Sequence, residues 1–195
     1  SIRVTAASSS SPVSHRMTPD ERRASLSLAG IFALRMLGLF LVLPVFALEA
    51  ARLPGGNDPA LVGLAMGIYG LTQAVMQVPL GLASDRVGRK KIIVIGLIVF
   101  ALGSVVAALA GGVQMLIVGR AIQGAGAVSA AVTALLADLT RDEVRTKGMA
   151  LVGVSIAAMF ALSLMAAPPL AGAIGLSGLF WLTTVLALAG IVLVL

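Results

Sequence analysis

Cysteine is absent from this chain, and its single histidine, His15, lies in a polar N-terminal stretch. Without thiols there is no disulfide framework and no thiolate metal site. A lone histidine among serines is more typical of a solvated residue than of a metal ligand. The sequence also offers no evident nucleophile–base pair and no cluster of metal ligands. We therefore expect no catalytic residues, no bound metal and no organic cofactor.

Charged residues are scarce as well. They make up 11% of the 195 residues, whereas about 25% is usual in a soluble domain. Apolar residues make up 59%, and the mean hydropathy is +1.07. A chain this short cannot bury so much apolar surface within itself, so the composition predicts an integral membrane protein in contact with the lipid bilayer. A very apolar soluble helical bundle fits less well, because the apolar runs are long and nearly free of charge.

Six apolar runs of roughly 20 residues each match the thickness of a bilayer core at a rise of about 1.5 Å per residue. They cover residues 26–48, 60–84, 92–110, 113–137, 148–167 and 176–195. Residues 1–16 are polar and rich in serine, and we expect them to be disordered. The predicted fold is an all-α integral membrane bundle of six transmembrane helices over residues 17–195.

The distribution of basic residues predicts how the bundle is oriented. The net charge of +6 and the pI near 11.1 are values that nucleic-acid-binding proteins also reach. Here, however, the basic residues form short clusters between apolar runs, so we expect no nucleic-acid partner. Eleven of them share one side of the membrane: Arg3, Arg16, Arg22, Arg23, Arg86, Arg89, Lys90, Lys91, Arg141, Arg145 and Lys147. Only Arg52 lies on the other side, which predicts a cytoplasmic N-terminus.

The segment 81–91 is the most specific signal in the sequence. Gly81, Ser84, Asp85 and Gly88 fall on one face of a helix end. Gly88 suits a helix-ending conformation that other residues avoid. Asp85 lies in the last turn, where the helix dipole disfavours an anion, so it needs a donor from a guanidinium or from another helix N-terminus. Arg89 is four residues on, and we expect it to bridge to Asp138. A generic basic loop is the alternative, but it does not explain this spacing.

Polar residues inside the spans give a second group of candidates. Arg120, Gln123 and Gly124 share one face of the fourth span. An arginine at such depth costs roughly 2.5–3.5 kcal/mol, so Arg120 either faces a transport cavity or extends to the membrane surface. Arg35 lies too deep in the first span for its side chain to reach the membrane surface easily.

The second span has two further faces of interest. Tyr69, Gln73 and Gln77 are four residues apart and are candidates for lining a substrate cavity. Gly63, Gly67 and Gly70 are more simply explained by close helix packing than by ligand contact. No acidic residue lies clearly within a span, so no proton-carrying carboxylate is visible.

Together these motifs resemble those of the major facilitator superfamily. The run Gly81-Leu-Ala-Ser-Asp85-Arg86-Val-Gly88-Arg89-Lys90-Lys91 resembles its signature loop between the second and third spans, with Ala83 where leucine is common. Leu116, Arg120, Gln123, Gly124 and Gly126 resemble the fourth-span motif of its proton-coupled members. Leu37-Gly38 and Pro44 resemble the first-span motif of its drug:proton antiporters. The fifth-span antiporter motif is degraded, since Ser163, Ala167 and Ala171 occupy glycine positions.

The resemblance implies the N-terminal half of a two-half transporter in a bacterial inner membrane, with the proton gradient as energy source. Its expected activity is export of small amphipathic molecules by alternating access. In the family, the loop aspartate meets a helix of the other half, so a C-terminal six-helix half is an expected partner. The loop residues Gly81, Asp85, Arg86, Gly88, Arg89 and Lys90, with Asp138, would form the conformational switch. The alternative is a truncated or half-size membrane module that acts in assembly without transport of its own.

Overall fold

The computed structural model describes residues 16–126 and 128–195, and every regular element in them is a helix. The helices are α1 (Pro19–Ala50), α2 (Pro59–Val87), α3 (Arg89–Ala108), α4 (Val113–Ala125), α5 (Ser129–Leu139) and α6 (Asp142–Val194). Apart from Arg16, the tail that the sequence predicts to be disordered lies outside the described residues.

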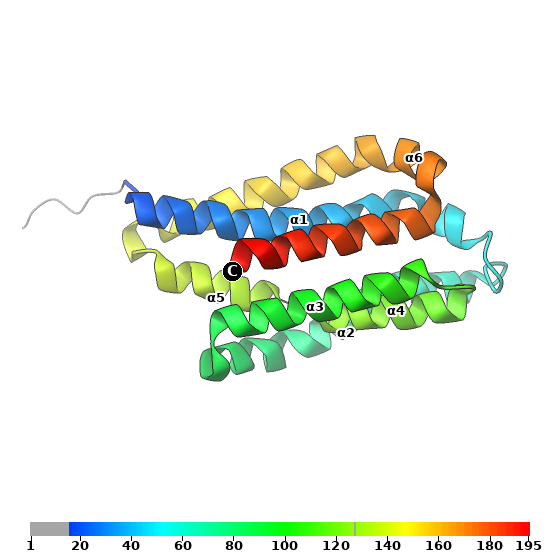
Figure 1. Ribbon diagram of the computed structural model, residues 1–195, viewed down its shortest axis with the longest axis horizontal. Helices are drawn as coiled ribbons and strands as arrows, with labels where there is room; N and C mark the ends of the chain where they lie inside the picture. Colours follow the sequence, from blue (N-terminus) through cyan, green and yellow to red (C-terminus); the bar gives the residue numbers. More distant parts are fainter. Residues whose placement is uncertain (1–15, 127) are drawn as a thin grey trace, which may run out of the picture.

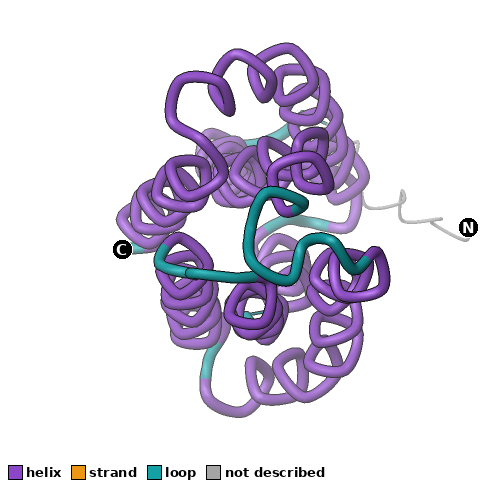
Figure 2. The backbone as a smooth tube through the Cα atoms, turned by 90° about the vertical axis from the view of Figure 1, so that its right-hand side faces the viewer, coloured by secondary structure: helices purple, strands orange, loops and turns teal. Residues whose placement is uncertain are grey.

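The helices lie side by side and run between the two ends of an elongated bundle (Figure 1). The start of α1, the α2–α3 turn and the α5–α6 junction lie at the left-hand end of Figure 1. The connections 51–58 and 109–112 cross the opposite end, which faces the viewer in Figure 2. α1 packs mainly against α6, α2 mainly against α4, and α3 against both α4 and α6.

Five helical segments of the described chain, rather than six, are long and apolar enough to cross a membrane. The difference arises in α6, where the fifth and sixth expected spans form one element of 53 residues. At about 1.5 Å per residue a straight helix of this size would be about 80 Å long, far more than one bilayer core. Gly175 has φ 71° and ψ −179°, and there the chain reverses direction (Figure 1). The expected end of the fifth span at residue 167, before Pro168-Pro169, is wrong, because both prolines lie inside the helix.

The fourth expected span, 113–137, is also not one regular helix. It is divided into α4 and α5, with Gly126 as the C-cap of α4 at φ −83° and ψ 39°. A Cβ on Gly126 would lie 2.9 Å from the backbone nitrogen of Phe100, so the chain passes directly against α3 at this break. The break therefore occurs where two backbones touch.

Side chains cap the starts of α1 and α2. Thr18 N–H donates to Glu21 Oε1 at 3.0 Å, and Glu21 N–H donates to Thr18 Oγ1 at 3.2 Å, which is a complete capping box. Asp58 Oδ1 accepts the N–H of Ala60 at 2.9 Å at the start of α2. These side chains satisfy backbone donors that a helix N-terminus otherwise leaves unpaired.

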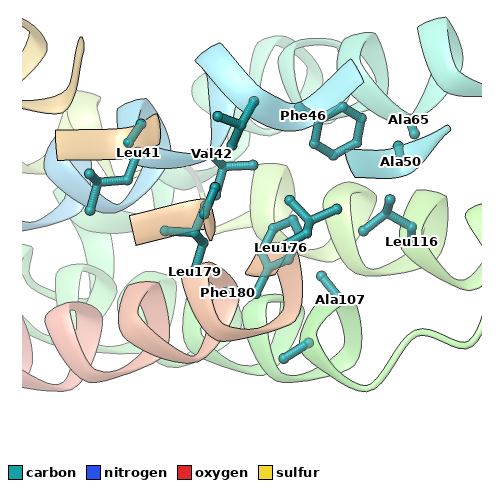
Figure 3. Close-up of a cluster of buried hydrophobic side chains, with 14 of the residues drawn as sticks. Leu41, Val42, Phe46, Ala50, Ala65, Ala107, Leu116, Leu176, Leu179 and Phe180 are labelled. Carbon is teal, nitrogen blue, oxygen red and sulfur yellow. The ribbon is translucent and has the colours of Figure 1, made fainter. Parts of the chain in front are cut away.

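Most of the interior is apolar, and the helices approach one another closely. One cluster of buried side chains joins five helices (Figure 3): Leu41, Val42, Phe46 and Ala50 of α1, Ala65 of α2, Ala107 of α3, Leu116 of α4, and Leu176, Leu179 and Phe180 of α6. In lipid the hydrophobic effect does not favour one apolar contact over another, so small residues and interhelical hydrogen bonds carry specificity. Thr183 Oγ1 of α6 donates to the carbonyl of Gly38 at 3.1 Å, and a Cβ on Gly38 would lie 2.8 Å from Thr183 Cγ2.

One face of α2 is open. Its side chains Leu71, Val75, Val78 and Leu82 are exposed. Nothing in the described chain lies within 4 Å of a Cβ placed on Gly63, Gly67 or Gly70. The expected packing of another helix against these glycines is therefore absent within the described residues.

Candidate functional site

The first candidate site begins at the turn between α2 and α3. Gly88 has φ 123° and ψ 140°, a backbone conformation that side-chain-bearing residues rarely adopt. Its N–H donates to the carbonyl of Ser84 at 3.2 Å, and its carbonyl accepts from Ile92 N–H at 3.3 Å. One glycine therefore ends α2 and begins α3 at Arg89. This is the shortest connection between helices in the described chain, and it fixes Arg89 beside the end of α2.

Arg89 joins three helix ends. Its Nε lies 3.0 Å from Asp138 Oδ2 at the end of α5, so the expected Arg89–Asp138 ion pair is present. Its Nη1 donates to Ser84 Oγ at 2.7 Å and also pairs with Asp85 Oδ1. The hydrogen bond to Asp138 raises the pKa of the Arg89 guanidinium, partial burial opposes this, and Asp85 adds to the rise. Asp85, an anion at the wrong end of its helix dipole, thus has a cationic partner within the chain.

The remaining loop residues lie around this ion-pair network. Gly81 lets α2 approach α5, since a Cβ there would lie 3.4 Å from the Cβ of Ala130. Arg86 and Lys90 are exposed at the end of the bundle. The carboxylates of Asp85 and Asp138 are both about half exposed. The ion-pair network of Asp85, Arg89 and Asp138, called the latch below, therefore lies at the surface between helix ends and is not a buried ion pair.

The second candidate site lies inside the bundle around Arg120 of α4. Arg120 is 2% exposed, so the alternative that it extends to the membrane surface is wrong for this structure. Its Nε donates to the carbonyl of Ala65 at 3.3 Å, and its Nη1 donates to Gln123 Oε1 at 3.2 Å. Gln123 Nε2 in turn donates to Ser104 Oγ of α3 at 2.7 Å. These bonds connect α2, α3 and α4 through polar groups that lipid would not solvate.

Arg35 of α1 enters the same region. It is 1% exposed, and its Nη2 donates to the hydroxyl of Tyr69 at 2.6 Å. Its guanidinium carbon lies 5.2 Å from the centre of the Phe100 ring, and that of Arg120 lies 5.0 Å from the centre of the Tyr69 ring. Both distances are typical of cation–π contacts. The sequence predicts the two arginines as separate candidates, whereas the structure brings both against one tyrosine.

The other predicted interior residues have different surroundings. Gly124 serves close packing, because a Cβ there would lie 3.1 Å from the backbone nitrogen of Gln73 in α2. Gln73 and Gln77 are half-buried on the side of α2 that follows Tyr69. The Oε1 atom of Gln77 is buried and has no hydrogen-bond partner among the described residues. Tyr69 is thus the only one of the three candidate cavity residues that the structure joins to the arginine pair.

The sequence does not predict the interaction between Glu21 and Arg141. Glu21, 5% exposed, accepts the backbone N–H of Arg141 at 2.8 Å and the Arg141 Nε at 3.0 Å, in addition to its capping bond. These bonds hold the start of α1 against the α5–α6 junction. The backbone N–H groups of Arg141 and Thr18 are the main cause that lowers the pKa of Glu21 to about 2. The capping box explains the residue locally, so no sequence signal indicates its second partner.

The fold and these motifs define a class. The family model of the Major Facilitator Superfamily matches residues 28–195, and the chain belongs to this family of transporters, which are not enzymes. Among curated relatives, the inner membrane transport protein YajR of Escherichia coli (strain K12) is 54% identical over 179 residues, which cover 92% of this chain and 39% of YajR. The tetracycline resistance protein, class B, of Escherichia coli is 31% identical over 147 residues, 74% of this chain and 36% of that protein.

Solved structures agree with the fold. The human organic anion transporter MFSD10 superposes with a TM-score of 0.76 at 21% identity, over 91% of this chain and 47% of that one. The POT family transporter PepTSo gives a TM-score of 0.80 at 15% identity, over 92% and 37%. These likenesses establish the helical arrangement. The chain spans less than half the length of the curated relatives that it matches.

Proposed function

We propose that this chain forms the N-terminal half of a secondary active transporter of the bacterial inner membrane. The complete carrier exports small amphipathic molecules in exchange for protons by alternating access between two membrane sides. Family membership supports the transporter class. The relatives named as an inner membrane transporter and as tetracycline resistance proteins support the membrane and the direction of transport.

The observation that carries the proposal is the latch of Asp85, Arg89 and Asp138. It joins the ends of α2, α3 and α5 at one end of the bundle, and its groups are partly exposed. An exposed ion pair contributes roughly 0.2–1 kcal/mol, so this network can break and re-form within a transport cycle. We assign it to the cytoplasmic end, because the described basic residues outside the interior gather there and only Arg52 lies at the other end.

A second six-helix half is part of the proposal. The open face of α2, with its glycines and exposed apolar side chains, has the character of a helix-packing surface. In the complete carrier, the half that follows would cover this face, and the substrate would bind between the halves near the middle of the membrane. Arg120, Gln123 and Arg35 would then act as coupling or cavity residues.

The test is transport by the product of the whole gene in proteoliposomes that enclose a pH-sensitive dye. Amphipathic anions, neutral compounds and cations are added one at a time across an imposed pH gradient. Proton movement that depends on the added compound, and that is reduced in Asp85→Asn, is the expected result. Glu143→Gln, which removes an exposed carboxylate at the same bundle end but outside the α2–α3 turn, is the matched control. Absence of compound-dependent proton movement for every class would favour the alternative, a membrane module that acts in assembly.

A further inference from the structure

Two guanidinium groups lie deep inside the bundle, and both contact Tyr69. Arg35 is near the middle of α1 and donates to the tyrosine hydroxyl, while Arg120 of α4 lies over the tyrosine ring. Their side chains are 1% and 2% exposed. The site is therefore a concentrated positive charge in a region that water does not reach.

No carboxylate of the sequence is placed to neutralise this charge. All eight acidic residues lie at helix ends or in the connections between helices: Asp20, Glu21, Glu49, Asp58, Asp85, Asp138, Asp142 and Glu143. The ion pairs of the described residues join five of these acids to Arg52, Arg89, Arg141 and Arg145. Arg35 and Arg120 have only neutral partners there, namely a hydroxyl, an amide oxygen, a carbonyl and aromatic rings.

Hydrogen-bond donors are also left over. A guanidinium offers five N–H groups in a planar fork, but Arg35 uses only Nη2. Its Nε and Nη1 atoms are buried and have no acceptor in the described chain. The Tyr69 hydroxyl accepts from Arg35, and no hydrogen bond that it donates is present among the described residues. Unpaired buried donors and an uncompensated buried charge both cost free energy. A negatively charged acceptor would pair the donors and neutralise the charge.

We propose that Arg35, Tyr69 and Arg120 form an anion-binding site that accepts a carboxylate group. The carboxylate belongs either to a small-molecule substrate or to a side chain of a further membrane segment. In the first case the site deepens the proposed function, on which this part rests, because it makes the preferred substrates anionic amphiphiles. The same positive charge disfavours amphipathic cations, because two buried guanidinium groups repel them in a medium of low dielectric constant.

The test uses radiolabelled salicylate, a small amphipathic carboxylate, and equilibrium dialysis with the whole gene product in lipid nanodiscs. We expect saturable binding that Arg35→Gln weakens at least ten-fold, since glutamine keeps a donor for Tyr69 but removes the charge. Arg52→Gln, at an exposed arginine of the opposite bundle end, leaves binding unchanged. Tetraphenylphosphonium, an amphipathic cation, does not compete. Should Arg35→Gln fail to fold, Arg120→Gln is measured in the same way.

Thermal unfolding distinguishes the two sources of the carboxylate. If salicylate does not bind, but Arg35→Gln lowers the Tm by at least 5 °C more than Tyr69→Phe, a carboxylate side chain fills the site. Tyr69→Phe is the matched comparison, because it removes the hydrogen bond between Arg35 and Tyr69 and keeps both charges. The proposal is overturned if salicylate does not bind and the two Tm shifts are equal, or if salicylate binds equally to wild type and Arg35→Gln.

Binding at equilibrium requires no transport, so the two proposals fail separately. Salicylate binding without compound-dependent proton movement would contradict only the proposed transport activity. Proton movement without salicylate binding, and without the larger Tm shift of Arg35→Gln, would contradict only the anion site.

Discussion

Arg89 at the start of α3 holds Asp138 near the end of α5, with 3.0 Å between Nε and Oδ2, although 49 positions separate them in the sequence. The same guanidinium holds Ser84 and Asp85 at the end of α2. One side chain therefore couples the end of α2, the start of α3 and the end of α5. Any motion that separates α5 from the α2–α3 turn must break this contact.

Asp138→Asn removes the charge of one partner and keeps its size. We expect transport by the complete carrier to fall about five-fold, which corresponds to about 1 kcal/mol for a partly exposed pair. Membrane insertion should not change, because Asp138 lies outside the apolar core of the bundle. Initial rates of uptake in proteoliposomes measure the effect. Asp142→Asn removes a more exposed carboxylate at the same bundle end, which pairs with Arg145 and not with Arg89, and should leave the rate unchanged. Equal effects of the two substitutions would contradict the latch.

The reversal of α6 depends on Gly175, whose φ of 71° and ψ of −179° belong to a region that is almost exclusive to glycine. Gly175→Ala should lower the free energy of unfolding by about 1–3 kcal/mol through backbone strain. Gly172→Ala is the control, because Gly172 lies within the helix with open space around it. There alanine should be neutral or stabilising by about 0.5–1 kcal/mol. Unfolding in mixed detergent and SDS micelles compares the two; a destabilisation of the same size in both would show that the reversal does not need glycine.

Glu21 predicts a pH dependence of stability. Its pKa falls from 4.5 in the unfolded chain to about 2 in the folded one, mainly through the backbone N–H groups of Arg141 and Thr18. A lowered folded-state pKa stabilises the protein above pH 4.5, and this contribution disappears as the pH falls towards 2. Glu21→Gln should therefore lower the Tm at pH 7, with a difference from wild type that shrinks between pH 5 and pH 2.

The control for this measurement is Glu143→Gln, which removes an exposed carboxylate from the first turn of α6. Its effect on Tm should be small at pH 7. A Tm difference between Glu21→Gln and wild type that stays constant from pH 7 to pH 2 would show that the carboxylate charge does not stabilise the α1–α6 contact.

The sequence predicts contacts well where position along a helix and side of the membrane suffice to define them. Arg89 and Asp138 both lie at the end of the bundle that carries the basic residues, so their pairing follows from the loop spacing. Arg35 and Tyr69 belong to different helices, and only the rotation of α1 against α2 decides that they meet. That rotation depends on the packing of many small residues, which no single motif records.

Proline and glycine in α6 also show why the sequence does not predict every helix end. Pro168-Pro169 is a strong helix-ending signal in a soluble protein, yet both residues lie inside α6. Membrane helices tolerate proline, because neighbouring helices and side chains satisfy the backbone groups that it frees. The chain instead turns seven residues later at Gly175, where the backbone conformation itself demands glycine.

Arg120 provides the last prediction, because its bonds are buried and polar. Arg120→Ala leaves the Gln123 Oε1 atom and the Ala65 carbonyl without their donor, so the free energy of unfolding should fall by about 1–3 kcal/mol. The proposed coupling role adds a functional effect: a pH gradient should no longer drive accumulation, while flux down a substrate gradient persists. Met115→Ala changes an exposed residue of the same helix and should leave both fluxes intact. Because downhill flux reports a folded carrier, undiminished pH-driven accumulation in Arg120→Ala would assign Arg120 to packing alone.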